Sequence, residues 1–345
     1  MTLISKIDEI NIDKDEIKKQ ANILKQGKTV IFPTETVYGL GANALDENAV
    51  SKIYEAKGRP SDNPLIVHIY DEKQVDDLAV DISEKAKLVM DKFWPGPITI
   101  IFNKKEIVPM RTSGGLNTVA IRMPSNPIAK ALLEEVKLPI AAPSANISGR
   151  PSPTRAKHVY EEMNNRVDGI ILGGDCTFGL ESTVLDLTNE VPMILRPGSI
   201  TKEDLEDVIG KVEIDPALEK KDSNIKAKAP GMKYKHYSPN ADVFIVSGSR
   251  NDVIDKVNKL IETNQNEGLK SVVMCLESNK EEYKGDTISL GKNLEEVAAN
   301  LFNALITADE NKYDIVYTEE FVNSGVGSAI MNRLLKSAGY KVIKV

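Results

Sequence analysis

The sequence predicts two α/β domains, of which the second is a small, doubly wound parallel sheet. Three observations support this prediction. The chain has 345 residues, more than one ordinary domain needs. Apolar, strand-like runs alternate with amphipathic helical patterns. Between residues 211 and 228 the sequence is charged and has no strong period, which is typical of a linker.

The first part of the chain, residues 1–210, has the pattern of an α/β or α+β domain. Amphipathic patterns predict helices at residues 14–25, 48–57, 83–92 and 128–135. Apolar runs predict strands at residues 29–32, 65–69, 98–102, 119–122, 140–142, 169–172 and 182–187. Thr201 followed by Asp204 is typical of a capped helix start, and this helix is expected to end near Gly210.

The last part of the chain alternates more regularly. Strands are predicted at residues 243–246, 271–276, 315–317 and 342–345. Helices are predicted at residues 253–262, 294–307 and 329–338. This alternation favours a Rossmann-like, doubly wound parallel unit. We therefore expect a first domain at 1–210, a linker at 211–240 and a second domain at 241–345.

Composition and charge narrow the classes of function. The formal net charge is −7, whereas proteins that grip nucleic acid over a broad surface are usually basic, so stable nucleic-acid binding is not expected. Cys176 and Cys275 lie far apart without a CxxC spacing, which argues against a disulfide framework or a thiolate zinc site. The sequence has no signal-peptide core and no apolar run of about 20 residues, so we expect a cytoplasmic protein without a membrane partner.

The most informative segment is Pro33-Thr-Glu-Thr-Val-Tyr-Gly-Leu-Gly41, directly after a predicted strand. Hydroxyl side chains and glycines at the carboxyl end of a strand let backbone N–H groups approach a ligand. The same residues also suit a tight turn that needs glycine for its backbone angles. Taken alone, the segment favours neither interpretation.

A second cluster combines two cations with neutral polar groups. Lys57 and Arg59 flank Gly58 just after a predicted helix. A turn at this point would direct both cations into one pocket for phosphate oxygens, and a solvated cationic loop is the alternative. Asn63 and His68 add hydrogen-bonding groups nearby, although a lone histidine on a strand is more often structural.

Three more segments carry groups suited to a polar ligand. Arg122 ends an apolar strand, where a charge needs a partner: either a substrate carboxylate or a buried Asp or Glu. Small residues flank Ser144 and Asn146 and leave room for a base or sugar, unless this is a plain Ser/Pro/Gly loop. Residues 179–183 and Arg196 offer a further hydroxyl pair and a further cation.

Several motifs are missing from the sequence. It has no GxxxxGK[ST] stretch, so phosphate binding would not use a P-loop. HExxH and GxSxG are absent and the three histidines are widely spaced, which argues against zinc and Ser-His-Asp hydrolases. Gly325-Val-Gly-Ser-Ala-Ile330 begins like a dinucleotide fingerprint but lacks the third glycine, so a helix-entry turn is the better interpretation.

Taken in order, these segments resemble the YrdC-like family in its two-domain form. The resemblance rests on residues 33–41 and on the pairs Lys57-x-Arg59 and Ser144-x-Asn146. Four stretches extend it: Asn63-Pro-Leu-Ile-Val-His68, Trp94-Pro-Gly-Pro97, Ala120-Ile-Arg-Met-Pro124 and Arg196-Pro-Gly198. It covers essentially all of residues 1–210 and implies a twisted mixed sheet with helices for the first domain. Residues 230–239 resemble the family's interdomain segment.

The resemblance implies a nucleotidyltransferase that makes threonylcarbamoyl-AMP and pyrophosphate from L-threonine, bicarbonate and ATP, for threonylcarbamoyladenosine in tRNA. The threonine-binding residues that it implies are Thr36, His68, Arg122, Ala142 and Ser182. The ATP-binding residues that it implies are Lys57, Arg59, Asn63, Thr118, Ser144, Asn146, Ser152, Arg196 and Tyr234. Lys57 and Arg59 are the expected catalytic residues, because with Arg196 they would stabilise negative charge on the reacting phosphate.

Further expectations concern cofactors and partners. Mg²⁺ is expected with ATP, held by phosphate and water rather than by a protein cage. The expected protein partners are downstream tRNA threonylcarbamoyl transferase proteins. The linker 211–240 is expected to close over the nucleotide and to protect a labile mixed anhydride from water. Two alternatives stay open: an RNA-binding module that uses the same concave basic pocket, and another carbamoyl or adenylyl transferase on this fold.

Overall fold

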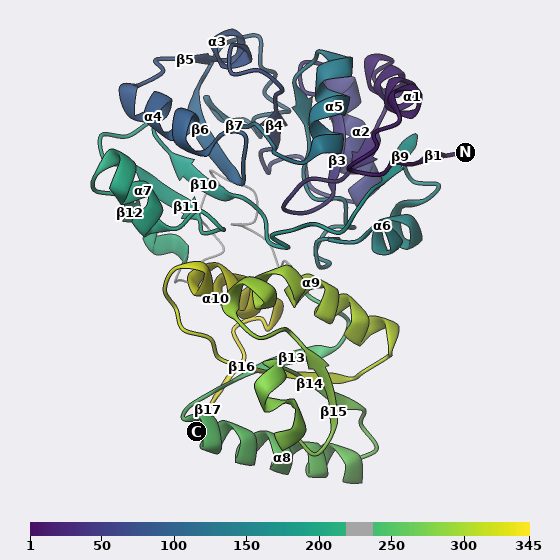
Figure 1. Cartoon of the computed structure of the whole chain (residues 1–345), viewed down its shortest axis with the longest axis vertical. Coiled ribbons are helices and arrows are strands. Elements are labelled where there is room, and N and C mark those ends of the chain that lie inside the picture. Colours follow the sequence, from purple (N-terminus) through teal and green to yellow (C-terminus); the bar gives the residue numbers. More distant parts are fainter. Residues whose placement is uncertain (219–236) are drawn as a thin grey trace. The chain divides into compact units, whose positions relative to one another are not determined.

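The computed structural model of the chain describes residues 1–218 and 237–345, which form two compact units (Figure 1). Within these ranges, the first unit holds residues 1–148 and 152–218, and the second holds residues 149–151 and 237–345. Both units are α/β. None of the helices in the described ranges combines the length and the apolar character that crossing a membrane requires.

A twisted mixed sheet of twelve strands forms the first unit (Figure 1). Across the sheet the strands follow the order β1 (Leu3–Lys6), β9 (Gly169–Leu172), β2 (Val30–Phe32), β3 (Gly39–Asn43), β8 (Ile140–Ala141), β4 (Ile66–His68), β7 (Thr118–Arg122), β6 (Ile98–Lys104), β10 (Thr183–Asp186), β11 (Met193–Arg196) and β12 (Glu213–Ile214). The remaining strand, β5 (Ala79–Val80), pairs with β6. Parallel and antiparallel pairs are mixed: β2, for example, runs antiparallel to β3 and parallel to β9.

Helices pack on both faces of this sheet. The helices are α1 (Lys14–Lys25), α2 (Glu47–Lys57), α3 (Gln74–Leu78), α4 (Glu84–Phe93), α5 (Pro127–Val136), α6 (Ala156–Met163) and α7 (Lys202–Ile209). Val30 and Phe32 belong to a core that contains residues of α1 and α5. Ile31, between them, belongs to the core that contains residues of α2, α4, α6 and α7. The strands are therefore buried on both faces, because successive side chains point to opposite sides.

Helix starts are specified by local side chains. The N-caps of α1, α2, α4 and α5 accept hydrogen bonds from first-turn N–H groups, and they are Asp13, Asp46, Ser83 and Asn126. Thr201 and Asp204 form the predicted capping box before α7, and Gly210 ends that helix. The start of α7 was readable in the sequence because a cap depends only on neighbours along the chain.

Strand β3 corrects the role that the turn interpretation gave to the glycines of the first motif. It begins within the 33–41 motif, for which the sequence left a tight turn open, and it pairs antiparallel with β2. A Cβ on Gly41 would lie 2.7 Å from Phe32 Cε1 and 2.8 Å from Ile140 Cγ2. Gly41 is therefore needed because two neighbouring side chains approach its backbone closely, and not for unusual backbone angles.

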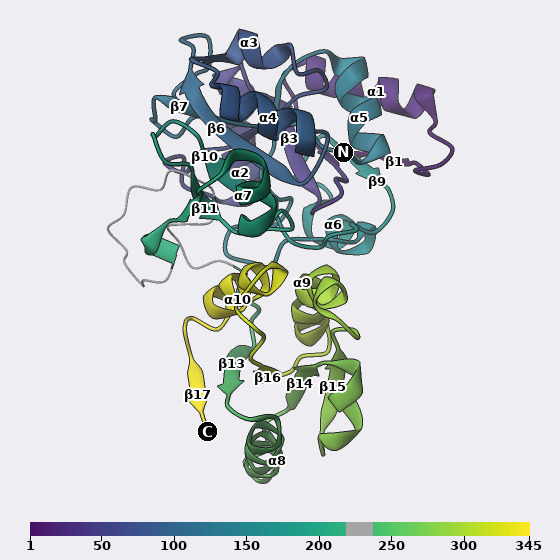
Figure 2. The same cartoon turned by 60° about the vertical axis from the view of Figure 1, so that its left-hand side comes forward.

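The second unit is a five-stranded sheet in which every pair is parallel. The strands follow the order β15 (Asp286–Ser289), β14 (Ser271–Cys275), β16 (Ile315–Glu319), β13 (Asp242–Ser247) and β17 (Val342–Lys344). Helix α8 (Arg250–Asn266) lies on one face, and α9 (Leu294–Glu310) and α10 (Val326–Ser337) lie on the other (Figures 1 and 2). This confirms the doubly wound parallel prediction. Gly325, with φ 53°, caps α10 and confirms the helix-entry turn.

Candidate active site

The loop between β2 and β3 lies at the centre of the candidate site. The Thr34 hydroxyl accepts the backbone N–H groups of Thr36 and Val37, both at 3.2 Å. It lies 2.6 Å from the Val37 carbonyl and 2.9 Å from Thr36 Oγ1. These bonds hold the loop in a compact turn at the carboxyl end of β2, with Glu35 and Thr36 buried.

Arg122, at the end of β7, connects this loop to the sheet. Its Nη1 donates to Thr36 Oγ1 at 2.8 Å, and its Nε donates to the Gly96 carbonyl at 3.4 Å. Its Nη2 lies 2.7 Å from Glu35 Oε1, and both side chains are almost fully buried. Of the two partners that the sequence left open, the structure contains the buried acid. Glu35 was not predicted as a site residue, although it is the one acidic residue in the 33–41 motif.

Both carboxylate oxygens of Glu35 are buried and accept no hydrogen bond from the described residues. Its contact with Arg122 is thus an ion pair without hydrogen-bond geometry. Buried polar atoms usually have hydrogen-bond partners. The Glu35 carboxylate can therefore accept hydrogen bonds from a polar ligand.

His68 lies next to Arg122 on the neighbouring strand. The two residues are paired in the register of β4 and β7, and His68 is also paired with Ile140 on β8. The His68 Nδ1 lies 3.3 Å from the Ile66 carbonyl, and the ring packs edge-on against Phe32. Burial, followed by the nearby Arg122 charge, lowers the pKa of His68 to about 3. The ring is therefore neutral at physiological pH.

A second cluster joins β6, β10 and β11. Arg196 donates from Nε to the Ser182 carbonyl and from Nη2 to Ser182 Oγ, both at 3.0 Å. Thr99 Oγ1 lies 2.7 Å from Ser182 Oγ. The Trp94–Pro97 turn links this cluster to the first, because the Pro97 carbonyl accepts the Thr183 N–H at 3.0 Å while Gly96 contacts Arg122.

Lys57, the last residue of α2, reaches into the loop after β8. Its Nζ donates to the carbonyls of Ser144 and Asn146, the latter at 2.6 Å, and lies 3.4 Å from Asn146 Oδ1. Burial, followed by the neighbouring Arg59 charge, lowers the pKa of Lys57 well below its usual value. In this structure Lys57 therefore anchors the 144–146 loop. Gly58 ends α2 with φ 60°, and Arg59 follows it, partly exposed.

The 144–146 loop also contacts the first motif. The Ala145 N–H donates to the Tyr38 carbonyl, and the Ser144 hydroxyl donates to Asn146 Oδ1 at 2.5 Å. Ala142 precedes this loop, and its N–H donates to the Ile66 carbonyl at 2.9 Å. The structure thus brings together the predicted residues Lys57, Ser144 and Asn146 beside the loop that holds Thr36.

Three other predicted residues lie on nearby segments. Asn63 is fully buried, yet neither atom of its side-chain amide has a hydrogen-bond partner in the described ranges. The Ser152 hydroxyl donates to Glu181 Oε1 at 2.7 Å, so Glu181 is a second acid that the sequence did not identify. Thr118 begins β7, at the opposite end of that strand from Arg122. Tyr234 lies outside the described residues, as does most of the segment expected to close over the nucleotide.

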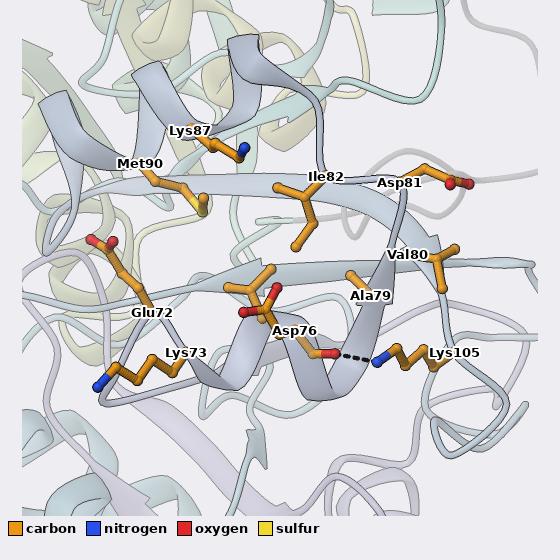
Figure 3. Close-up of a pocket in the computed structure, with 11 residues that line it drawn as sticks. Glu72, Lys73, Asp76, Ala79, Val80, Asp81, Ile82, Lys87, Met90 and Lys105 are labelled. Atoms are coloured by element: carbon orange, nitrogen blue, oxygen red, sulfur yellow. Dashed lines mark hydrogen bonds between the residues drawn. The ribbon is translucent and has the colours of Figure 1, made fainter.

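A separate surface groove of about 640 Å³ lies between the α3–β5 segment and α4 in the first unit (Figure 3). Exposed charged side chains line much of it, among them Lys73, Lys87 and Asp81. Lys105 donates to the Asp76 carbonyl there. None of the predicted site residues lines this groove.

Comparisons with known proteins place this geometry in a family. A family model described as telomere recombination, for the Sua5, YciO and YrdC proteins, matches residues 22–198. A model described as threonylcarbamoyl-AMP synthase, C-terminal domain, matches residues 200–339. A threonylcarbamoyl-AMP synthase of Pyrococcus abyssi (strain GE5 / Orsay) is 49% identical over 346 residues, which cover 100% of both chains. The chain belongs to the threonylcarbamoyl-AMP synthase family.

Two further similarities support this family membership. The threonylcarbamoyl-AMP synthase of Bacillus subtilis (strain 168) is 49% identical over 341 residues, which cover 98% of this chain and 97% of the relative. The crystal structure of P. abyssi Sua5 complexed with L-threonine matches the whole chain with a TM-score of 0.95 and 49% identity, and it is itself covered fully. The resemblance and the fold class predicted from the sequence are therefore confirmed.

Proposed function

We propose that the chain is a threonylcarbamoyl-AMP synthase, which joins L-threonine, bicarbonate and ATP into threonylcarbamoyl-AMP and pyrophosphate. The main support is the similarity to curated synthases over the full length of the chain. The product is a mixed anhydride, so its threonylcarbamoyl group is activated for transfer to an acceptor. Downstream proteins that transfer the threonylcarbamoyl group to tRNA are the corresponding partners.

The threonine pocket is assigned to Thr36, His68, Arg122, Ala142 and Ser182. Arg122 has five N–H donors, and its contacts to Thr36, Glu35 and Gly96 leave donors for the amino-acid carboxylate. The neutral His68 ring suits hydrogen bonding to a hydroxyl rather than charge pairing, because burial keeps its pKa low. Ala142 has a small side chain and would leave room for the substrate.

The nucleotide pocket is assigned to Lys57, Arg59, Asn63, Thr118, Ser144, Asn146, Ser152, Arg196 and Tyr234. Asn63 gives the clearest support, because its fully buried amide has no hydrogen-bond partner among residues 1–218 and 237–345, which is uncommon, and adenine or ribose would supply one. Arg196 is buried beside Ser182, which is assigned to the threonine pocket. The Arg196 guanidinium would therefore lie next to both the threonine pocket and the nucleotide pocket.

The proposed synthesis of threonylcarbamoyl-AMP has two steps. The threonine amine attacks the carbon of bicarbonate, water leaves, and a carbamate forms. A carbamate oxygen then attacks the α-phosphorus of ATP and pyrophosphate leaves. The second step needs no general base, because the attacking oxygen is already anionic. Lys57, Arg59 and Arg196 would stabilise the charge that develops on the phosphate oxygens.

Mg²⁺ would enter this reaction with ATP. The described residues hold no group of three His, Cys, Asp or Glu side chains arranged to bind a metal. Phosphate oxygens and water would therefore supply most of its ligands, which suits an ion that keeps several waters. When bound, it would offset charge on the triphosphate.

The decisive test measures pyrophosphate release from ATP with threonine and bicarbonate each supplied or withheld. We expect release only when both are present, together with a threonylcarbamoyl-adenylate peak in mass spectrometry. Serine in place of threonine is the matched control for side-chain recognition. Pyrophosphate release that does not depend on threonine would indicate that the site uses another acceptor. The absence of pyrophosphate release from folded protein supplied with Mg²⁺ would overturn the proposal.

A further inference from the structure

The parallel sheet of the second unit has a topological switch point. Strands β13 and β16 are neighbours in this sheet. The helix after β13, α8, lies on one face, whereas the helix after β16, α10, lies on the opposite face (Figures 1 and 2). In open α/β sheets a crevice forms outside the carboxyl ends of two such strands, because their connections diverge there. The topology therefore marks this edge of the unit as a place for a ligand.

A cavity of about 500 Å³ occupies this edge, and we call it the switch-point cleft. Its walls come from the ends of β13, β14 and β16, from the first turn of α8 and from the segment after β16. Val246, Val253 and Phe321 line the cleft as buried side chains, whereas Leu276 is partly exposed and Val322 is 68% exposed, so these two present the accessible apolar surface. The volume lies within the range of about 300–1,000 Å³ that is usual for small-molecule sites.

A buried carboxylate lines the switch-point cleft. Glu319 ends β16 and is 9% exposed. Its Oε1 accepts bonds from Asn279 Nδ2 and the Tyr283 hydroxyl, each at 2.7 Å, and its Oε2 accepts the Leu276 N–H at 3.3 Å. These three donors are uncharged. Because a carboxylate has about four lone-pair sites, Oε2 keeps capacity for a further donor.

The charge around the cleft disfavours an anionic ligand. Two carboxylates, Glu319 and Glu320, line it together with one cation, Arg250. That guanidinium already pairs with Glu282 and donates to Asn279 Oδ1 at 3.1 and 3.2 Å. A phosphate would therefore meet two negative groups and a cation that is already engaged. Uncharged hydroxyl groups would instead find a buried acceptor in Glu319.

We propose that the switch-point cleft binds an uncharged ribonucleoside. A sugar hydroxyl donates to Glu319 Oε2, and the flat base packs against the apolar side chains of Leu276 and Val322. Acidic side chains serve the same purpose toward ribose hydroxyls in other doubly wound folds. This site lies wholly within the second unit and does not depend on the reaction proposed for the first.

The test is a methyl NMR titration of the full chain with adenosine. We expect saturable shifts of the methyl signals of Val246, Val253, Leu276 and Val322. Signals from the first unit are followed in the same spectra, so adenosine that binds there is distinguished by position. Glu319→Gln removes the charged acceptor and should weaken binding by about tenfold or more.

Two further variants separate binding from folding. Val322→Trp enlarges an exposed side chain at the cleft and should weaken binding to a similar degree without disturbing the core. Leu269→Trp, at a 37% exposed position that does not line the cleft, is the matched control and should leave binding unchanged.

The proposal fails if adenosine produces no saturable shift of the methyl signals of these four residues, or if both cleft variants bind as the wild type does. AMP that binds as tightly as adenosine would overturn the preference for an uncharged ligand. Agmatine serves as a cationic probe. If agmatine shifts these signals and adenosine does not, the cleft binds a cation instead. The proposal is supported if Glu319→Gln and Val322→Trp both weaken adenosine binding while Leu269→Trp binds adenosine as the wild type does.

Discussion

The two units of the molecule bury charge in different ways. In the first, the cation of Arg122 lies beside the buried acid Glu35, and Lys57 is surrounded by backbone carbonyls. In the second, Glu319 is held by an amide, a hydroxyl and a backbone N–H. Removing one member of a buried ion pair leaves an uncompensated charge, whereas neutral donors tolerate the loss of a charge more easily. The first unit should therefore be more sensitive to single changes at its site.

Glu35→Gln should have the largest effect on stability. It leaves Arg122 buried without its counter-charge, and breaking a buried pair on one side costs about 3–5 kcal/mol. We expect the free energy of unfolding of the first unit to fall by this amount. Trp94 is the single tryptophan of the chain and is buried in the first unit, so its fluorescence during a urea titration reports on that unit.

The double variant Glu35→Gln, Arg122→Gln is the control for this prediction. It removes both charges, so it should recover part of the lost stability, and the interaction energy follows from the double-mutant cycle. A Trp94 transition that is unchanged in Glu35→Gln would show that the pair does not stabilise the folded unit.

Lys57→Met should have the largest effect on activity. The variant would lack the charge that we propose for the developing negative phosphate, and the 144–146 loop loses its anchor. Removing one preorganised donor of this kind typically lowers the rate by about 10²–10³-fold. Threonine-dependent pyrophosphate release measures the effect. Lys52→Met, on the exposed face of the same helix, is the matched control, and equal losses in both variants would contradict the assignment.

His68 should make the first unit sensitive to acid. Its folded pKa of about 3 lies below the usual value of 6.5, so the unfolded state binds the proton more readily. The stability it contributes is complete above about pH 6.5 and is lost as pH falls toward 3, by about 1.4 kcal/mol per pH unit. Between pH 6 and pH 4, His68→Gln should therefore show a shallower loss of stability in Trp94-detected unfolding. Parallel curves for the two proteins would contradict the buried, neutral ring.

Glu262→Gln should have the smallest effect. It breaks the 2.7 Å ion pair with Lys284 in the second unit, where both side chains are more than half exposed. Exposed pairs contribute little, because water and salt screen them. We expect no resolvable change in the unfolding midpoint followed by far-UV circular dichroism. A shift as large as that of Glu35→Gln would remove the contrast between the two units.

Local sequence features predicted much of the fold. The helix at 14–25 matches α1, and the Thr201–Asp204 box begins α7, because amphipathic spacing and caps depend on neighbouring residues. Several short elements were missed, among them β1, β11, β15 and α6. Their sequences are brief and become ordered only by pairing or packing, so no local pattern distinguishes them.

The candidate site was predictable as a set of residues but not as a set of contacts. The motifs predicted Thr36, Lys57 and Arg122 as site residues. They did not identify Glu35 as the partner of Arg122, nor the loop carbonyls that hold Lys57. The switch-point cleft was also missed, since Glu319 belongs to no motif and matters only because it lies beside Asn279 and Tyr283.

The sequence by itself determined the family, the strand and helix pattern and the residues available for chemistry. Only the tertiary structure decided how those residues pair. Glu35 meets Arg122 because β2 and β7 belong to one sheet, with three strands between them. Position 41 requires glycine because the side chains of Phe32 and Ile140 approach its backbone closely. Contacts between distant segments follow from sheet order, and sheet order depends on how the whole chain buries its apolar surface.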